Sequence, residues 1–166
     1  DALTNLANRK AFDERLEELC AAEDASPLTL AILDIDHFKR FNDTWGHQTG
    51  DQVLRYVATV MSRVCPGDRF ATRFGGEEFA IIFPGEKAGS VTAVLETIRH
   101  EVASRSLRRR STNDDLGTVT ISAGFAQRLP GEAAAALLER ADAALYASKR
   151  AGRNRVTGAS TLEKAA

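Results

Sequence analysis

The spacing of apolar residues changes several times along this chain, and the order of those changes limits the folds that it can adopt. Segments with apolar residues at helical spacing alternate with short apolar runs that are typical of strands. The predicted order is helix, strand, helix, strand, strand, helix, strand, helix, which contains a β-α-β-β-α-β core of the ferredoxin-like kind. We therefore predict an α+β fold with one central, mainly antiparallel sheet flanked by helices.

Local signals indicate where these elements lie. The side chain of Asn8 can cap a first helix that ends near Ala22, ahead of Pro27. The other expected helices contain residues 53–64, 91–102 and 137–145. The expected strands are residues 28–36, 69–74, 79–83 and 118–125. Gly75 and Gly76 would join the second and third strands as a hairpin.

Composition excludes some classes of partner. The 166 residues include 22 Lys plus Arg and 23 Asp plus Glu, for a net charge of −1, whereas general nucleic-acid binders are strongly basic. The longest apolar run, 133–138, is far shorter than the roughly 18 residues that cross a membrane. We expect no nucleic-acid partner, no membrane contact by this domain, and a cytoplasmic location in which the isolated Cys20 and Cys65 stay reduced. One domain is expected over 1–157, followed by a polar C-terminal tail at 158–166.

The segment RFGGEEF at 73–79 carries the strongest local signal for a functional site. Two adjacent glycines permit unusual backbone angles and leave no side chain in the way, so a base or a phosphate can approach the main chain. Glu77 and Glu78 follow, and in extended backbone they would point to opposite faces of the sheet, so that at most one could join Asp34 on a given face. Carboxylates from neighbouring strand ends suit Mg²⁺, which binds through a few carboxylates together with waters and substrate phosphates.

The sequence also contains cationic side chains that could bind the phosphates of a substrate. Lys39 follows the strand end, and Lys149 and Arg153 lie one turn apart near the end of the last helix. Each feature alone also fits a structural role. The glycine turn could be an ordinary hairpin, Lys149 and Arg153 could complement a helix C-terminus, and Asp34 and Asp36 could be a polar strand end. Packing or capping is the simpler interpretation of His37, His47 and Trp45, and a solvated loop that of residues 105–110.

These pieces occur together in one order, and in that order the sequence resembles the GGDEF-family diguanylate cyclase domains. The likeness covers DALTNLANR at 1–9, LDIDHFKRFNDTWGHQTGD at 33–51, RFGGEEF at 73–79, VTISAG at 119–124 and ADAALYASKRAGRNRV at 141–156. The resemblance implies an enzyme of bacterial signalling that condenses two GTP into cyclic di-GMP with release of pyrophosphate.

The same resemblance implies a metal site and catalytic groups. Mg²⁺, or Mn²⁺ in its place, would be bound by the carboxylates of Asp34 and Glu77 and by the main-chain carbonyl of Ile35, with Glu78 in support. Glu77 would also activate the 3′-hydroxyl of GTP, and Lys39 would stabilise the developing negative charge.

The implied GTP-binding residues are Phe38, Lys39, Asn42, Asp51, Gly75, Gly76, Lys149 and Arg153. Phe38 and Lys39 would lie at the phosphates, with Lys149 and Arg153 at the γ-phosphate end. Asn42 and Asp51 match the guanine-reading positions. An aspartate accepts from the N1–H and N2–H₂ donors of guanine, whereas adenine presents an acceptor at N1, so Asp51 favours GTP over ATP.

One departure from the family pattern concerns product inhibition. Active members often carry an R-x-x-D pair, but here Pro66 stands in the Arg position and Arg69 in the Asp position, with Asp68 one residue out of register. We therefore expect the primary inhibitory site to be missing or rebuilt.

The family's chemistry requires two domains, each presenting one GTP to the other. The resemblance thus implies a second copy of this domain as a partner, and an upstream sensory or dimerising region that lies outside this chain. Two other interpretations stay open at this point. The domain could be a catalytically silent module that binds GTP or signals through protein contacts, or a cyclase-like palm that acts on another nucleotide.

Overall fold

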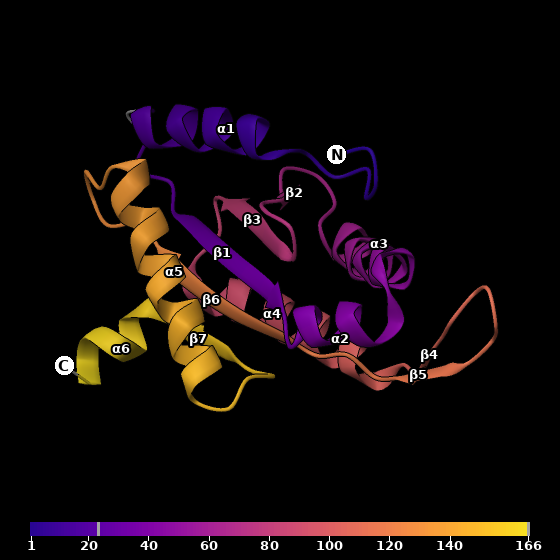
Figure 1. Ribbon diagram of the computed structural model, residues 1–166. Helices are drawn as coiled ribbons and strands as arrows, with labels where there is room; N and C mark the ends of the chain where they lie inside the picture. The colour runs from indigo at the N-terminus through magenta and orange to yellow at the C-terminus, as the bar shows by residue number, and fades with distance from the viewer. Residues whose placement is uncertain (23, 166) are drawn as a thin grey trace.

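The protein is built around one five-stranded sheet, seen in a computed structural model that describes residues 1–22 and 24–165 (Figure 1). The strands of this sheet are β1 (Leu28–Ile35), β2 (Phe70–Arg73), β3 (Glu78–Pro84), β6 (Ile121–Gln127) and β7 (Val156–Gly158). Their order is β2-β3-β1-β6-β7, and every neighbouring pair is antiparallel except the parallel pair β6 and β7. The first four strands in this order have the ferredoxin-like arrangement, which confirms the predicted fold class.

Helices cover both faces of the sheet and give the protein two apolar cores. The helices are α1 (Arg9–Ala21), α2 (Phe38–Trp45), α3 (His47–Val64), α4 (Ala88–Ser104), α5 (Ala134–Arg150) and α6 (Ala159–Ala165). One core joins the sheet to α2, α3 and α4, and the other joins it to α1, α5 and α6. In Figure 1, α5 crosses in front of the sheet and α1 lies along one end of it.

The alternation of side chains along β1 decides which face receives each residue. All eight residues of β1 are buried. Leu33 and Ile35 belong to the core under α3 and α4, whereas Leu30 and Ile32 belong to the core under α5. Asp34 follows Ile32 on the α5 side, so this strand delivers a carboxylate to the end of a buried apolar face.

Close backbone packing fixes α5 on that face. A Cβ atom on Gly124 of β6 would lie 2.0 Å from the backbone nitrogen of Leu145 in α5. Only a residue without a side chain allows this approach, because real Cβ atoms do not come so near to backbone atoms. The close approach brings the last turn of α5, with Lys149, against the end of β1.

The sequence identifies the long elements but not all of their ends, since α3 begins at His47 and not near residue 53, and it misses some of the short elements. Asn8 caps α1 as predicted, and its Oδ1 accepts from the backbone N–H of Ala11 at 2.9 Å. The helix α2 was not predicted, because it has eight residues and begins after His37, whose φ of 57° is left-handed and whose side chain makes no capping hydrogen bond. The small hairpin of β4 (Leu107–Arg108) and β5 (Asp115–Gly117) was also not predicted.

The segment expected to be a polar tail contributes structure. Its first residue ends β7, and α6 follows directly. Ala159 is buried in the core under α5, and Glu163 pairs with Arg140 of α5, with 2.9 Å between Oε1 and Nε. The division of the chain at residue 157 stays a prediction.

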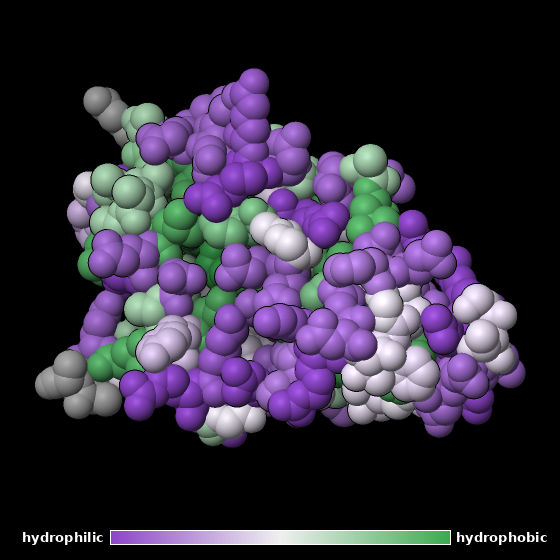
Figure 2. Space-filling view, viewed as in Figure 1, coloured by the Kyte–Doolittle hydropathy of each residue, from purple (hydrophilic) through white to green (hydrophobic). Residues whose placement is uncertain are grey.

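The outer surface is largely polar. In the view of Figure 2, hydrophilic residues predominate and hydrophobic ones lie mainly in recesses between them. Within residues 1–22 and 24–165, no helix combines the length and apolar character needed to span a bilayer.

Candidate functional site

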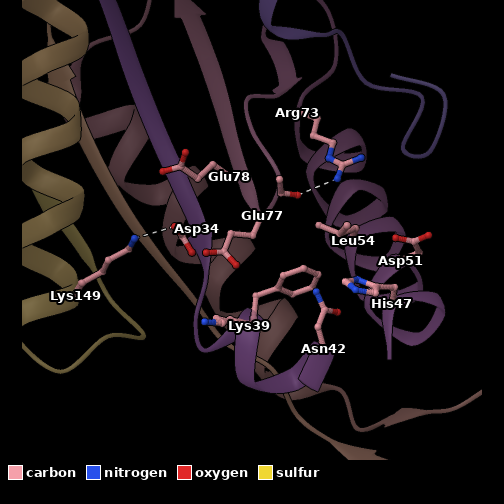
Figure 3. Close-up of a pocket in the computed structure, with 12 residues that line it drawn as sticks. Asp34, Lys39, Asn42, His47, Asp51, Leu54, Arg73, Glu77, Glu78 and Lys149 are labelled. Carbon is pink, nitrogen blue, oxygen red and sulfur yellow. Dashed lines mark hydrogen bonds and ion pairs between the residues drawn. The ribbon is translucent and has the colours of Figure 1, made fainter. Parts of the chain in front are cut away.

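A pocket of about 620 Å³ opens where several of these elements end or begin. The end of β1, the turn between β2 and β3, the start of α2, the first turns of α3 and the last turn of α5 meet around it (Figure 3). Its lining residues are Asp34, Phe38, Lys39, Asn42, His47, Asp51, Leu54, Arg73, Gly76, Glu77, Glu78 and Lys149. Most of the residues that the sequence singles out therefore lie in one cavity.

Three carboxylates form the acidic part of the pocket. Asp34 is 4% exposed and lies directly opposite Glu78 in the register of β1 and β3. Glu77 lies in the bend just before β3, where its carbonyl oxygen accepts from the N–H of Ile35 at 3.3 Å. The expectation that at most one of Glu77 and Glu78 joins Asp34 on a given face of the sheet stays a prediction. Because the pocket opens at the ends of the strands, both glutamates line it together with Asp34.

Lys149 is the cation that pairs with this acidic part. Its Nζ donates to Oδ2 of Asp34 at 2.8 Å, and the Asp34 side chain is 6% exposed (Figure 3). Burial lowers the pKa of Lys149, but the hydrogen bond and charge of Asp34, with the charges of Glu78 and Glu77, outweigh burial and raise it. The ammonium group is therefore held in its charged form beside the carboxylates.

Even with Lys149 in place, the surroundings of the three carboxylates disfavour their negatively charged form. Burial raises the pKa of Asp34, although Lys149 opposes the shift. Burial and then the charge of Asp34 raise the pKa of Glu77 and that of Glu78. Charge repulsion and desolvation thus leave this part of the pocket in need of further positive charge.

The donor set fits a divalent metal that arrives together with a nucleotide. Among the residues that the structure describes, no group of three or more His, Cys, Asp or Glu side chains is arranged to hold a metal by itself. Mg²⁺ binds through one or two carboxylates and takes its other ligands from waters and substrate phosphates. The oxygens of Asp34 and Glu77, with Glu78 beside them, suit this mode of binding.

The neighbouring Asp36 is fully engaged in holding the fold. Its carboxylate accepts from Thr120 Oγ1 at 2.7 Å, Ser122 Oγ at 2.6 Å and the backbone N–H of Asn154 at 3.0 Å. These bonds tie the end of β1 to the start of β6 and to the loop after α5. Asp36 thereby fixes the walls of the pocket without lining it.

The other end of the pocket carries amide, carboxylate and apolar groups suited to a planar base. Asn42 in α2 lies against Gly50 in α3, where a Cβ atom would be 1.8 Å from Asn42 Oδ1. This Oδ1 is buried and has no hydrogen-bond partner within the described part of the chain. Asp51 and Leu54 line the same end from α3, and the buried Leu54 supplies an apolar wall.

Three predicted site residues do not line the pocket. Ile35 is 1% exposed, and in the resemblance only its main-chain carbonyl has a role. Gly75 lies behind Glu78, to whose carbonyl oxygen its N–H donates at 3.1 Å. Arg153 stands on the loop after α5, from where its charge lowers the pKa of Asp34 slightly against the dominant effect of burial. None of these positions excludes the predicted roles, which stay predictions.

The two glycines of this turn differ in the space around them, since a Cβ atom on Gly75 would lie 3.3 Å from Glu78 Oε2. Neither Gly75 nor Gly76 has a positive φ, contrary to the use expected from the sequence. A Cβ atom on Gly76 would meet no atom within 4 Å. The turn thus presents bare backbone to the pocket, as a site for close approach of a ligand requires.

Sequence reasoning missed three of the lining residues. His47, expected to pack or cap, is the first residue of α3 and faces the pocket (Figure 3). Leu54 lies in the helix expected to contain residues 53–64, and its helical spacing gives no sign of a second role. Arg73 donates from Nη2 to the carbonyl oxygen of Gly76 at 2.9 Å and so holds the glycine turn.

Comparisons with known proteins agree with the fold and identify the family. The family model described as "Diguanylate cyclase, GGDEF domain" matches residues 1–155. The chain is 37% identical over 156 residues to diguanylate cyclase VdcA of Vibrio cholerae and 42% identical over 158 residues to diguanylate cyclase DgcP of Pseudomonas aeruginosa. The matches cover 94% of this chain but 45% and 23% of those relatives, so the chain spans less than half of either.

A solved structure of similar length also matches this chain over nearly all of both chains. The GGDEF domain of DgcB from Caulobacter crescentus, in complex with c-di-GMP, is 65% identical and superposes with a TM-score of 0.94. The match covers 96% of this chain and 95% of that one. The chain therefore belongs to the GGDEF domain family.

Proposed function

We propose that this chain is a diguanylate cyclase domain, which condenses two GTP into cyclic di-GMP and releases two pyrophosphates. The observation that carries the proposal is the meeting of Asp34, Glu77 and Glu78 with Lys149 in one pocket whose other end holds Asn42 and Asp51. The names of the relatives and the c-di-GMP bound to the DgcB domain support it.

In each half-reaction a 3′-hydroxyl oxygen attacks the α-phosphorus of the other GTP, and the bond from that phosphorus to pyrophosphate breaks. The proton of the hydroxyl goes to Glu77, whose pKa is raised by burial and by the charge of Asp34. A carboxylate with a raised pKa is a better proton acceptor near neutral pH than an ordinary glutamate. A bound Mg²⁺ or Mn²⁺ would neutralise phosphate charge and make the attacking hydroxyl more acidic.

Cationic and backbone groups of the chain hold the triphosphate. Lys39, in the first turn of α2, and Lys149 both line the pocket. Backbone N–H groups at the start of α2 have no partners within the helix and can donate to phosphate oxygens. When phosphates enter, Lys149 can leave Asp34 for the γ-phosphate end, where Arg153 would join it.

The base end of the pocket favours guanine. Asp51 can accept from the N1–H and N2–H₂ groups of guanine, whereas adenine would place its own acceptor against this carboxylate. Asn42 lies beside Asp51 across the contact of α2 with α3. The apolar surface of Leu54 suits one face of a planar ring. We infer that GTP is preferred over ATP.

A single domain supplies half of the reacting groups, so the proposal requires a second copy as partner. Bringing two nucleotides into mutual alignment can contribute about 7–11 kcal/mol toward the barrier in well-oriented systems. We infer that activity rises steeply with protein concentration. A dimerising or sensory region upstream, as the relatives' greater length allows, would have the same effect.

The structure also gives Arg69 a use that suits the proposed loss of the inhibitory pair. Its Nε and Nη2 donate to the two carboxylate oxygens of Glu86 at 2.8 Å each, and its Nη1 donates to the carbonyl oxygen of Val64 at 2.7 Å. Because these guanidinium N–H groups are occupied, Arg69 connects the segment just before α4 to the end of α3. We infer that product inhibition through this position is absent.

The test is turnover of GTP with Mg²⁺ at increasing protein concentration, with and without fusion to a dimerising helix. Cyclic di-GMP should form more than proportionally with concentration, and the Glu77→Gln variant should lose product formation while it keeps GTP binding. Glu14→Gln, on the exposed face of α1, removes the same charge far from the pocket and should leave turnover unchanged. If the wild type binds GTP but makes no product even when fused, the domain is a silent binding module.

A further inference from the structure

A second pocket of about 530 Å³ lies between α3 and the segment that contains β4. Its lining residues are Gln52, Arg55, Tyr56, Thr59, Arg105, Ser106, Leu107, Arg108 and Arg110. In Figure 1, β4 and β5 lie beside α2 and α3 and extend away from the sheet. The volume falls within the range of about 300–1,000 Å³ that is typical of small-molecule sites.

The charge of this pocket is of one sign. Arg55, Arg105, Arg108 and Arg110 line it, and no aspartate or glutamate is among the lining residues. Within residues 1–22 and 24–165, none of these four arginines has a carboxylate within 4.0 Å. Guanidinium groups gathered without anions repel one another, and an added anion removes this repulsion.

Acidic groups near the pocket form no ion pair within 4.0 Å with its arginines among the described residues, although the charge of Asp115 interacts with that of Arg108. Asp115 accepts from Ser106 Oγ at 3.1 Å and from the N–H of Gly117 at 2.8 Å. Glu101 pairs with Arg63, on the other side of Tyr56. The arginine side chains therefore keep donors that an incoming ligand can use.

The walls of the pocket are fixed by hydrogen bonds. The side chain of Gln52 donates from Nε2 to the carbonyl oxygen of Arg108 at 2.6 Å and accepts at Oε1 from the N–H of Arg110 at 3.2 Å. Tyr56 donates from its hydroxyl to the carbonyl oxygen of Glu101 at 3.0 Å, and the guanidinium of Arg105 lies 5.9 Å from the centre of its ring. A helix and an irregular strand are thus joined at the floor, and the arginines stand at the rim.

We propose that this pocket binds a small phosphate-bearing anion of the polyphosphate class, such as a nucleotide polyphosphate or a free polyphosphate. Guanidinium groups bind phosphate oxygens in a bidentate manner, which an ammonium group cannot do. Several converging arginines suit a ligand with more than one phosphate. A concave site favours a small ligand over a nucleic acid or a membrane surface, each of which would need an extended basic face.

The site is separate from the acidic pocket and does not depend on the proposed function. Helix α3 contributes Asp51 to one pocket and the adjacent Gln52 to the other, so the two open on different sides of this helix. Their charges differ, because three carboxylates line the first pocket and arginines line the second. Without divalent cations, a free polyphosphate should be repelled by the carboxylates and should bind at the arginines.

The experiment is a titration of the protein with tripolyphosphate in EDTA, followed by calorimetry and by amide chemical shifts. We expect saturable binding of one ligand per chain, with the largest shifts at the amides of Gln52 and Arg110. The Arg108→Ala/Arg110→Ala variant should bind on the order of tenfold more weakly. The variant with lysine at both positions should show an intermediate loss, because it keeps the charge but not the guanidinium fork.

A matched control removes the same charge from another face. Lys10→Ala/Arg15→Ala, at an exposed and a half-buried position of α1, should leave the affinity unchanged. Equal weakening in the control and in the arginine variant would overturn the proposal, since binding would then follow net charge alone. Shifts confined to the amides of Lys39 and Gly76 would also overturn it, as would binding of single-stranded RNA or anionic vesicles without binding of tripolyphosphate. Repeating the titration with GTP in EDTA distinguishes a nucleotide from a free polyphosphate as the better ligand.

Discussion

The ion pair between Lys149 and Asp34 gives a prediction about stability that does not require catalysis. Replacing Lys149 by Met leaves the carboxylate of Asp34, 6% exposed, without the ammonium that lies 2.8 Å from it. Removing one partner of a fully buried pair costs about 3–5 kcal/mol, whereas exposed pairs contribute about 0.2–1 kcal/mol. Lys149 is 31% exposed, so we expect a loss of about 1.5–3 kcal/mol in the free energy of unfolding near neutral pH.

The loss should depend on pH with a defined sign. Burial raises the pKa of Asp34 in the folded protein above its ordinary value of 3.8, and without Lys149 the pKa should rise further. Between 3.8 and the raised pKa the folded state keeps a proton that the unfolded state releases, so stability falls as the pH rises through this window. The deficit of the variant should therefore be largest near neutral pH and shrink as the pH approaches 3.8.

Urea unfolding in EDTA measures this deficit. Lys39→Met is the matched control, because Lys39 lines the same pocket but has no carboxylate within 4.0 Å among the described residues. The control should change the unfolding free energy by less than about 0.5 kcal/mol. A Lys149→Met deficit no larger than that of the control, or one that is constant from neutral pH to pH 4, would refute this reasoning.

Other predictions concern the scaffold and are checked by urea or thermal unfolding. Arg69→Ala should lose about 1.5–3 kcal/mol, because it leaves the carboxylate of Glu86 without its bidentate partner; an unchanged midpoint would contradict this role. Gly124→Ala should lose about 1–3 kcal/mol or more, since its Cβ would stand 2.0 Å from the backbone nitrogen of Leu145; wild-type stability would mean that α5 can move away freely. Asn8→Ala should lose about 0.5–2 kcal/mol of stability because the N-cap of α1 is removed. Asn8→Asp should keep most of the wild-type stability, because aspartate can also cap the helix.

Much of the fold follows from local patterns. The spacing of apolar residues identifies the long helices and the core strands, because each of these elements buries one or both of its faces. Apolar spacing does not identify the short elements. Contacts with α3, which no local pattern shows, hold α2 and the hairpin of β4 and β5. No local pattern shows the pocket at the strand ends either, where two adjacent glutamates lie together.

Most members of the site could be predicted from the sequence, but the contacts between them could not. Asp34 and Lys149 are 115 residues apart, and their contact depends on the packing of α5 over Gly124. Arg69, which occupies the position of the aspartate in the family's inhibitory pair, forms an ion pair with Glu86. Contacts between residues so far apart in the sequence depend on the assembled fold.

The central claim is that Asp34 and Glu77 hold one divalent cation together with the phosphates of GTP. Anomalous diffraction at the manganese edge tests it most directly, on crystals grown with Mn²⁺ and a GTP analogue that cannot react. The account predicts a manganese peak in contact with both carboxylates and with phosphate oxygens, with Lys149 moved from Asp34 to the triphosphate. A nucleotide bound in this pocket with no manganese between the two carboxylates would contradict it.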